Sequence, residues 1–167
     1  MEYLAVVDEK DKVIGKKSRK YVHDHHLIHR GVHVFVVDNS GRILIQKRSK
    51  SKKDRAGYLD ASVGGQVLSC ETYRVAAIRE AKEELGVDIK NIKEVCKYKS
   101  FSKRQREIRT LFTACHDGPF SINCKEIEWV KFFTLKKISE MIMNKNLVFT
   151  DGFRLSFKYY LRKVGEN

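Results

Sequence analysis

The sequence predicts an α/β domain in which helices cover a mixed, curved β-sheet. Several runs alternate apolar and polar residues, which is typical of strands, while one central segment repeats its apolar residues at steps of three and four, which is typical of a helix. No repeat or linker interrupts the 167 residues, of which 42% are hydrophobic. The chain is therefore expected to form one domain over residues 1–167.

The first predicted strands are Val32–Asp38 and Arg42–Arg48, whose alternating residues flank the turn sequence NSG. A short glycine-containing turn between two such runs indicates a β-hairpin. Leu59–Val63 is predicted as a further short strand. Gly64 and Gly65 after it are expected to form a tight loop that enters a helix.

The central helix is predicted over Glu71–Leu85. Gly86 is placed to end this helix in a left-handed conformation. A buried stripe is expected from the apolar residues at steps of three and four, namely Val75, Ile78, Ala81 and Leu85.

The rest of the chain is predicted to supply more strands and two helices. Extended structure is expected to restart in Val87–Phe101, and two strands are predicted at Arg106–His116 and Glu128–Leu135. Helices are predicted at about 135–144 and 151–163.

Charge and cysteine usage limit the class of protein. The net charge of +13 predicts attraction to polyanions without choosing among them, and the basic runs Gln46–Arg55 and Lys97–Arg109 fit either phosphate binding or a solvated loop. No apolar run reaches the roughly 20 residues of a membrane span, and the N-terminus lacks a secretory pattern. A cytoplasmic protein is expected, with reduced thiols at Cys70, Cys96, Cys115 and Cys124.

Three carboxylates gather within one turn of the predicted helix, on the side opposite the apolar stripe. Glu80, Glu83 and Glu84 occupy positions i, i+3 and i+4, where like charges repel by a few tenths of a kcal/mol per pair. A solvated acidic face is one explanation. A divalent cation such as Mg²⁺, which prefers oxygen ligands, is the other.

The spacing around these carboxylates resembles the signature of the Nudix hydrolase family. That signature is G-x5-E-x7-R-E-U-x-E-E-x-G-U, with U an apolar residue, and it fits residues 65–87 of this chain. Its apolar positions hold Ala81 and Val87, and its seven fixed positions hold Gly65, Glu71, Arg79, Glu80, Glu83, Glu84 and Gly86. The resemblance covers roughly residues 30–135.

The resemblance implies the Nudix fold, a mixed sheet between helices, and a site for Mg²⁺ or Mn²⁺. It implies that the carboxylates of Glu80, Glu83 and Glu84 bind the metal together with the backbone carbonyl of Gly65. It also implies that Arg79 and Glu71 hold these carboxylates in place.

The implied reaction is hydrolysis of a diphosphate bond in a small nucleotide-type or other organic diphosphate. The resemblance leaves the general base open between Glu83, Glu84 and the more distant Glu107, and Arg79 is grouped with them as a catalytic residue. We expect substrate phosphates to be bound by the basic loop and its neighbours, with Arg48, Lys47, Lys53 and His29 as the named residues.

A second resemblance, to isopentenyl-diphosphate isomerase, gives a competing enzyme function. The isomerase subgroup has HR before its first core strand and KRS after the second, as this chain does. His29 and Glu107 match a histidine and a glutamate of that enzyme. However, Val63 and Gly65 stand where the isomerase has its cysteine and a metal-binding histidine, so the proton-transfer nucleophile is missing.

Two further expectations concern other partners. The histidines between His23 and His33 are not spaced to share one face of a helix or strand, so a direct metal role for them is not favoured. A non-catalytic nucleotide- or RNA-binding module is the alternative to an enzyme, but no aromatic-rich RNA-binding motif is present, and nucleic acid is not the favoured partner. Either a monomer or a homodimer is expected.

Overall fold

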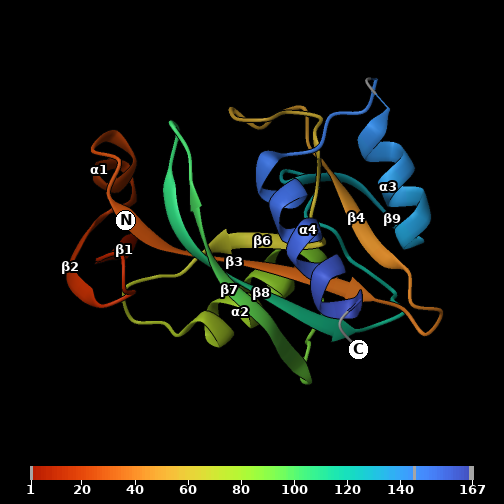
Figure 1. Ribbon diagram of the computed structural model, residues 1–167, viewed down its shortest axis with the longest axis horizontal. Coiled ribbons are helices and arrows are strands. Elements are labelled where there is room, and N and C mark those ends of the chain that lie inside the picture. The colour runs from red at the N-terminus through yellow and green to blue at the C-terminus, as the bar shows by residue number, and fades with distance from the viewer. Residues whose placement is uncertain (1, 145, 166–167) are drawn as a thin grey trace.

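The computed structural model describes residues 2–144 and 146–165, and it shows a curved mixed sheet with helices on both faces (Figure 1). The described helices are α1 (Arg19–Asp24), α2 (Tyr73–Leu85), α3 (Leu135–Met143) and α4 (Asp151–Gly165). The described strands are β1 (Tyr3–Val7), β2 (Val13–Ser18), β3 (Ile28–Val37), β4 (Ile43–Arg48), β5 (Leu59–Asp60), β6 (Val63–Gln66), β7 (Ile92–Phe101), β8 (Arg106–Cys115) and β9 (Ile127–Phe133). The predicted α/β class is confirmed.

Strand β3 lies at the centre of the sheet. It runs parallel to β8 from the pair Ile28 and Arg106 to the pair Val37 and Cys115, and antiparallel to β6 on its other edge. Strands β4 and β9 pair antiparallel, as do β7 and β8. This arrangement brings the functional segments β6, β3 and β8 side by side.

The predicted hairpin between β3 and β4 is present, although its two strands pair over only a short stretch beside the turn. Asp38 Oδ1 accepts hydrogen bonds from the backbone N–H groups of Ser40 (3.0 Å) and Arg42 (2.8 Å), which closes the turn. The two strands then pair only between Val37 and Ile43. They diverge because β8 and β6 occupy the edges of β3, while β4 pairs with β9 and β5.

Helix α2 covers one face of the sheet and α3 and α4 cover the other. The α2 side buries a cluster formed by Val32, Val34, Val36, Leu44, Val63, Ala76, Ala77, Ala81 and Leu85. The other side buries Phe35, Ile43, Ile45, Leu111, Ile138, Met141, Phe153 and Phe157. Both helical layers are therefore held by apolar burial.

Two details of the central segment differ from the sequence prediction. Val75 is 51% exposed rather than buried, because α2 packs through Ala76, Ala77 and Ala81. Gly64 and Gly65 lie within β6, paired with His33 and Val32 of β3, and do not form a loop. The helix begins at Tyr73, where the hydroxyl of Thr72 accepts the N–H of Val75, and it ends as predicted at Gly86 (φ 68°).

The N-terminal elements β1, β2 and α1 were not predicted. Leu4 and Val6 of β1 and Val22 of α1 form a small separate core with Leu27 and Leu68. The predicted later strands and helices are present as β7, β8, β9, α3 and α4, with shifted ends. Among the described helices, none is long and apolar enough to cross a membrane. The four cysteines are unpaired.

Candidate functional site

Glu80 of α2 lies directly on the backbone of Gly65 in β6. A Cβ atom added to Gly65 would stand 2.1 Å from Glu80 Cδ, which is far closer than real side chains approach. A side chain at this position would therefore displace the carboxylate. The glycine is needed for close approach and not for an unusual backbone conformation.

Arg79 ties the carboxylates of the site together. Its Nε and Nη2 atoms donate to the two oxygens of Glu71 (2.7 and 2.9 Å), and its Nη1 donates to Glu80 (2.8 Å) and Glu83 (3.2 Å). Nη2 also donates to the carbonyl of Gln66 (3.0 Å). Arg79 thus links α2, the loop before it and β6.

Glu84 carries the most perturbed carboxylate of the helix. Burial, together with the neighbouring charge of Glu80, raises the pKa of Glu84 to about 8, although a hydrogen bond from Gln46 Nε2 (3.1 Å) acts in the other direction. Burial also raises the pKa of Glu80, despite its hydrogen bond from Arg79. Negative charge at this place is therefore only partly compensated by the protein.

These side chains surround a hollow of about 250 Å³, here called the carboxylate hollow. Its lining includes Gly65, Arg79, Glu80, Glu83, Glu84 and Asn123. Oxygen donors with raised pKa values suit a hard divalent cation, so the residues fit Mg²⁺ or Mn²⁺. Among the described residues, no three His, Cys, Asp or Glu side chains already stand close enough to hold an ion. Arg79 Nη1 donates to both Glu80 and Glu83.

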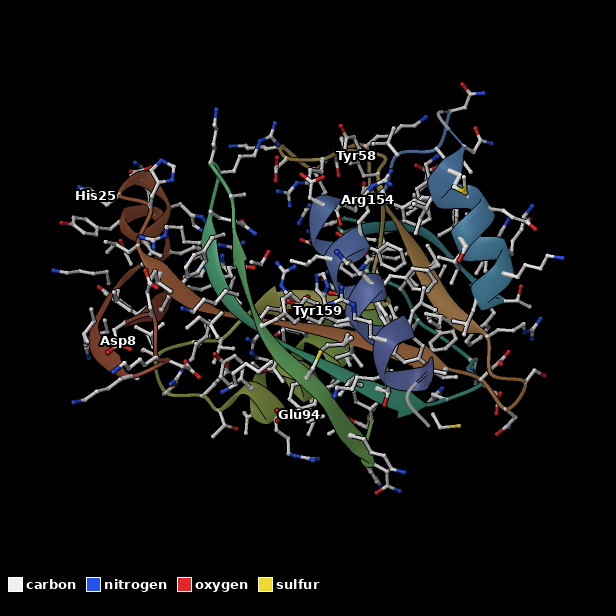
Figure 2. All side chains as sticks on the ribbon, in the orientation of Figure 1. Asp8, His25, Tyr58, Glu94, Arg154 and Tyr159 are labelled. Carbon is white, nitrogen blue, oxygen red and sulfur yellow. The ribbon has the colours of Figure 1, made fainter. Side chains whose placement is uncertain are left out.

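A larger basic cleft of about 1070 Å³ adjoins the carboxylate hollow. The two share Arg19, Arg48, Lys52, Gly64, Gly65, Gln66 and Glu126. The loop that ends at Tyr58 forms one wall and lies beside the start of α4 (Figure 2), where Leu59 N donates to Val148 O (2.9 Å) and Thr150 N to Leu59 O (3.0 Å). The carboxylate hollow and the basic cleft are therefore neighbouring spaces that open into one another.

The structure brings some of the predicted substrate-binding residues to these spaces. Arg48 lines both, and Lys53 lines the basic cleft. Lys47 lines neither, and its Nζ pairs with Glu128 Oε1 at 3.0 Å. Successive side chains of a strand point to opposite faces, so Lys47 points away from the side that Gln46 and Arg48 share.

Glu107 and His29 lie deeper than the sequence suggested. Glu107 is 3% exposed, receives a hydrogen bond from Arg109 Nη2 and lies 3.3 Å from His29 Nε2. It lines the basic cleft and not the carboxylate hollow. Burial alone would raise the pKa of Glu107, but Arg109 and His29 outweigh it and lower the pKa well below its ordinary value. His29 lines neither space and contacts Gln66 Nε2 (3.2 Å).

Sequence reasoning missed several residues that the structure places in these spaces, above all Gln46, Gln66 and Arg109. The strand period offered one usable signal, because Glu107 and Arg109 are two apart on one strand and must share a face. Gln46 and Gln66 carried no such signal. Their roles depend on how β4 and β6 approach α2.

Arg79→Gln is expected to lower the free energy of unfolding by about 1–3 kcal/mol at neutral pH, because the carboxylates of Glu71 and Glu80 lose charged donors. Burial raises the pKa of Glu71, but Arg79 and the N–H of Leu68 lower it below its ordinary value overall. The stability that Glu71 contributes is therefore present above about pH 4.5 and is lost as the pH falls further.

Chemical denaturation of both proteins between pH 3 and 7 measures this difference. Arg74→Gln is the matched control, because Arg74 is an exposed arginine of the same helix. An equal loss of stability in both variants, or a loss that does not shrink at low pH, would contradict the assigned role of Arg79.

Known proteins that resemble this chain belong to the family whose signature the carboxylate helix carries. The model of the NUDIX domain matches residues 27–151. A protein of Yersinia pestis named as an uncharacterized Nudix hydrolase is 35% identical over 139 residues, which are 83% of this chain and 76% of that protein. Isopentenyl-diphosphate Delta-isomerase 2 of Photorhabdus laumondii is 30% identical over 157 residues, which are 92% of this chain and 89% of that protein.

A solved structure extends the likeness to the whole fold. The crystal structure of DR0079 from Deinococcus radiodurans superposes with a TM-score of 0.82 at 28% identity, over 95% of this chain and 99% of that one. The family match spans well over half of the chain and includes α2 with its carboxylates. The chain is therefore a hydrolase that belongs to the NUDIX domain family.

Proposed function

We propose that the chain is a hydrolase dependent on a divalent metal, which cleaves the diphosphate linkage of a nucleotide-type or other organic diphosphate by attack of water at phosphorus. The observation that carries this proposal is the meeting of Glu80, Glu83, Glu84 and Gly65 around one hollow beside a basic cleft. The free thiols support a reducing compartment such as the cytoplasm as its place of action.

The proposed ligands of Mg²⁺ or Mn²⁺ are the carboxylates of Glu80, Glu83 and Glu84 and the carbonyl of Gly65. Such an ion neutralises charge on the diphosphate oxygens and lowers the pKa of a bound water. Arg79 and Glu71 orient the set, since one guanidinium bonds Glu71, Glu80 and Glu83 at once.

Glu83 and Glu84 are the proposed general bases. Both line the carboxylate hollow, and the side chain of Glu83 is 57% exposed and can pass a proton to solvent. Glu107 suits this role less, because its lowered pKa makes it a weak base and it lies outside the hollow.

Arg48 and Lys53 are the proposed contacts to the substrate phosphates. Arg48 lines both spaces and is held by hydrogen bonds to the carbonyls of Asp54 (3.0 Å) and Arg55 (3.2 Å). These hydrogen bonds fix the side chain of Arg48 against the basic loop, beside the carboxylate hollow. Lys53 lies on that loop at the cleft.

A release assay tests the proposal over a set of nucleoside diphosphates, nucleoside triphosphates and nucleotide sugars, with Mg²⁺, with Mn²⁺ and with EDTA. We expect phosphate-containing products from wild type with either metal and none with EDTA. Glu83→Gln is expected to lower kcat by roughly 10²-fold or more if Glu83 is the base. An inert wild type that binds RNA tightly without metal would favour a non-catalytic binding module.

Isomerisation is the second candidate, favoured by the 30% identity to the isomerase of Photorhabdus laumondii. The local structure opposes it, because Val63 is fully buried and Gly65 offers no side chain, so neither can transfer a proton. We therefore expect no conversion of isopentenyl diphosphate to dimethylallyl diphosphate. Such conversion, followed by proton nuclear magnetic resonance, would revive the isomerase.

A further inference from the structure

The carboxylate hollow and the basic cleft meet at a boundary that is lined by three cations, and this boundary is here called the junction. The cations are Arg19 at the start of α1, Arg48 at the end of β4 and Lys52 in the basic loop, and all three line both spaces. Among the described residues, Glu126 is the only carboxylate that lines both. The junction therefore carries a net positive charge and attracts anions.

The carboxylate of Glu126 already lies among these cations, because it forms an ion pair with Lys52 Nζ. The two arginines have acidic partners that line only one space each. Glu2, 3.0 Å from Arg19 Nη1, lines the hollow, and Asp60, 3.6 Å from Arg48 Nη1, lines the cleft. Glu126 is thus the one internal anion at the junction among the described residues.

The backbone around this ion pair is held in place, while its two side chains remain accessible. Ser49 N donates to Glu126 O (2.9 Å), and Ser51 Oγ donates to Lys125 O (3.2 Å), which ties the basic loop to the segment before β9. The side chains of Lys52 and Glu126 are 27% and 37% exposed. Ion pairs with this exposure contribute little to stability, so the pair can open by rotation of two side chains.

A phosphate group is a stronger partner for the junction than the carboxylate of Glu126. It carries nearly two negative charges at neutral pH and three acceptor oxygens, so it can pair with several of the cations at once. A phosphate at the junction would also repel the nearby carboxylate. Binding of the phosphate and the pairing of Glu126 with Lys52 therefore oppose each other.

We propose that the junction is a phosphate-binding site formed by Arg19, Arg48 and Lys52, and that Glu126 occupies Lys52 until a substrate phosphate replaces it. The proposal rests on the proposed function for the presence of a diphosphate at the carboxylate hollow. It makes Lys52 a phosphate-binding residue and Glu126 an internal competitor that weakens substrate binding. Because Arg19 lies outside the matched residues 27–151, the N-terminal elements also contribute to the site.

Titration calorimetry with inorganic diphosphate in EDTA tests the inference without turnover. We expect Glu126→Gln to bind diphosphate about two- to fivefold more tightly than wild type, because the amide neither competes for Lys52 nor repels the ligand. Lys52→Gln and Arg19→Gln are each expected to bind it at least about twofold more weakly. Glutamine keeps the backbone hydrogen bond of Glu126 to Ser49, so the informative variant should fold as wild type does.

Glu128→Gln is the matched control. Glu128 pairs with Lys47 at 3.0 Å, these two side chains are 35% and 26% exposed, and neither residue lines the hollow or the cleft. The control therefore removes the same charge from the same kind of pair, and it should bind diphosphate as wild type does. Equal tightening in Glu126→Gln and Glu128→Gln would assign the effect to the net charge of the chain and would overturn the proposal.

A double variant separates competition from simple repulsion. If Glu126 competes for Lys52, the tightening caused by Glu126→Gln should be smaller when Lys52→Gln is already present. If Glu126 only repels the ligand, the tightening should be the same in both backgrounds. That second result would contradict the exchange of Glu126 for a phosphate.

The outcomes separate this inference from the proposed function. Glu126→Gln that binds diphosphate no more tightly than wild type, or no measurable binding by any of the proteins, overturns the junction site even if hydrolysis is observed with metal. Tighter binding by Glu126→Gln, with Glu128→Gln unchanged, supports the junction site. The same result in a protein that hydrolyses no diphosphate would support the site and contradict the hydrolase.

Discussion

Replacing Glu84 with glutamine is expected to lower kcat for diphosphate hydrolysis by about 10³-fold while making the metal-free protein more stable. The loss of activity follows because the amide keeps the shape of the carboxylate but carries no charge for a cation and accepts no proton. The gain in stability follows because Glu84 is a buried carboxylate with a pKa raised to about 8.

The pH dependence of this effect has a definite sign. Folding of the metal-free chain takes up a proton at Glu84 between its ordinary pKa of 4.5 and about 8, so its contribution to stability is lost as the pH rises through that window. Glu84→Gln removes this pH-dependent loss of stability, because glutamine does not ionise. The advantage of the variant in EDTA should be absent near pH 4 and reach on the order of a few kcal/mol above pH 8.

Denaturation in EDTA and in Mg²⁺ measures both halves of this prediction. Mg²⁺ should stabilise wild type and have no such effect on Glu84→Gln. Glu94→Gln is the control, because Glu94 is an exposed glutamate of β7 (Figure 2) that lines neither the carboxylate hollow nor the basic cleft. Equal stabilisation of all three proteins by Mg²⁺ would contradict a cation at the carboxylate hollow.

Gly65→Ala is expected to weaken binding of the activating metal and lower kcat/KM by roughly 10–100-fold, with the fold intact. The new methyl group would stand 2.1 Å from Glu80 Cδ, so the carboxylate must leave its place on β6. The nearest atoms to that methyl group all belong to Glu80, and the backbone of Gly65 is extended. The damage should therefore be confined to the carboxylate.

Activity titrated with Mg²⁺ measures this loss, and circular dichroism checks the fold. Gly15→Ala is the matched control in another strand, since a Cβ at Gly15 meets nothing within 4 Å. Unchanged metal dependence in Gly65→Ala would show that the position of Glu80 on Gly65 is unimportant for the site.

The sequence was sufficient for the fold class and for the three helical carboxylates at the hollow, Glu80, Glu83 and Glu84, because spacing on a helix fixes which side chains share a face. The sequence was not sufficient where tertiary contacts determine which side chains are buried and which residues pair. Val75 fits a helical stripe as well as Ala76 does, yet the small alanines lie against the sheet and Val75 is 51% exposed. Helical period alone cannot choose between two neighbouring stripes.

Gly64 and Gly65 show a second limit. Two adjacent glycines favour a turn, but here they pair with His33 and Val32 of β3 within β6, and their missing Cβ atoms leave room for His33 and Glu80. Lys47 and Glu107 show a third limit. Residue type suggested phosphate binding and base chemistry, whereas strand alternation turns Lys47 toward Glu128 and Arg109 pairs with Glu107.

Hydrolysis in water enriched in oxygen-18 tests the central claim most directly. Wild type, Mg²⁺ and a nucleoside diphosphate or triphosphate are incubated, and the products are analysed by mass spectrometry. We expect one oxygen-18 atom in a phosphate group of one product, formed only with metal and nearly absent in Glu84→Gln. Cleavage that places the label on carbon, or labelled products formed equally well in EDTA, would contradict it.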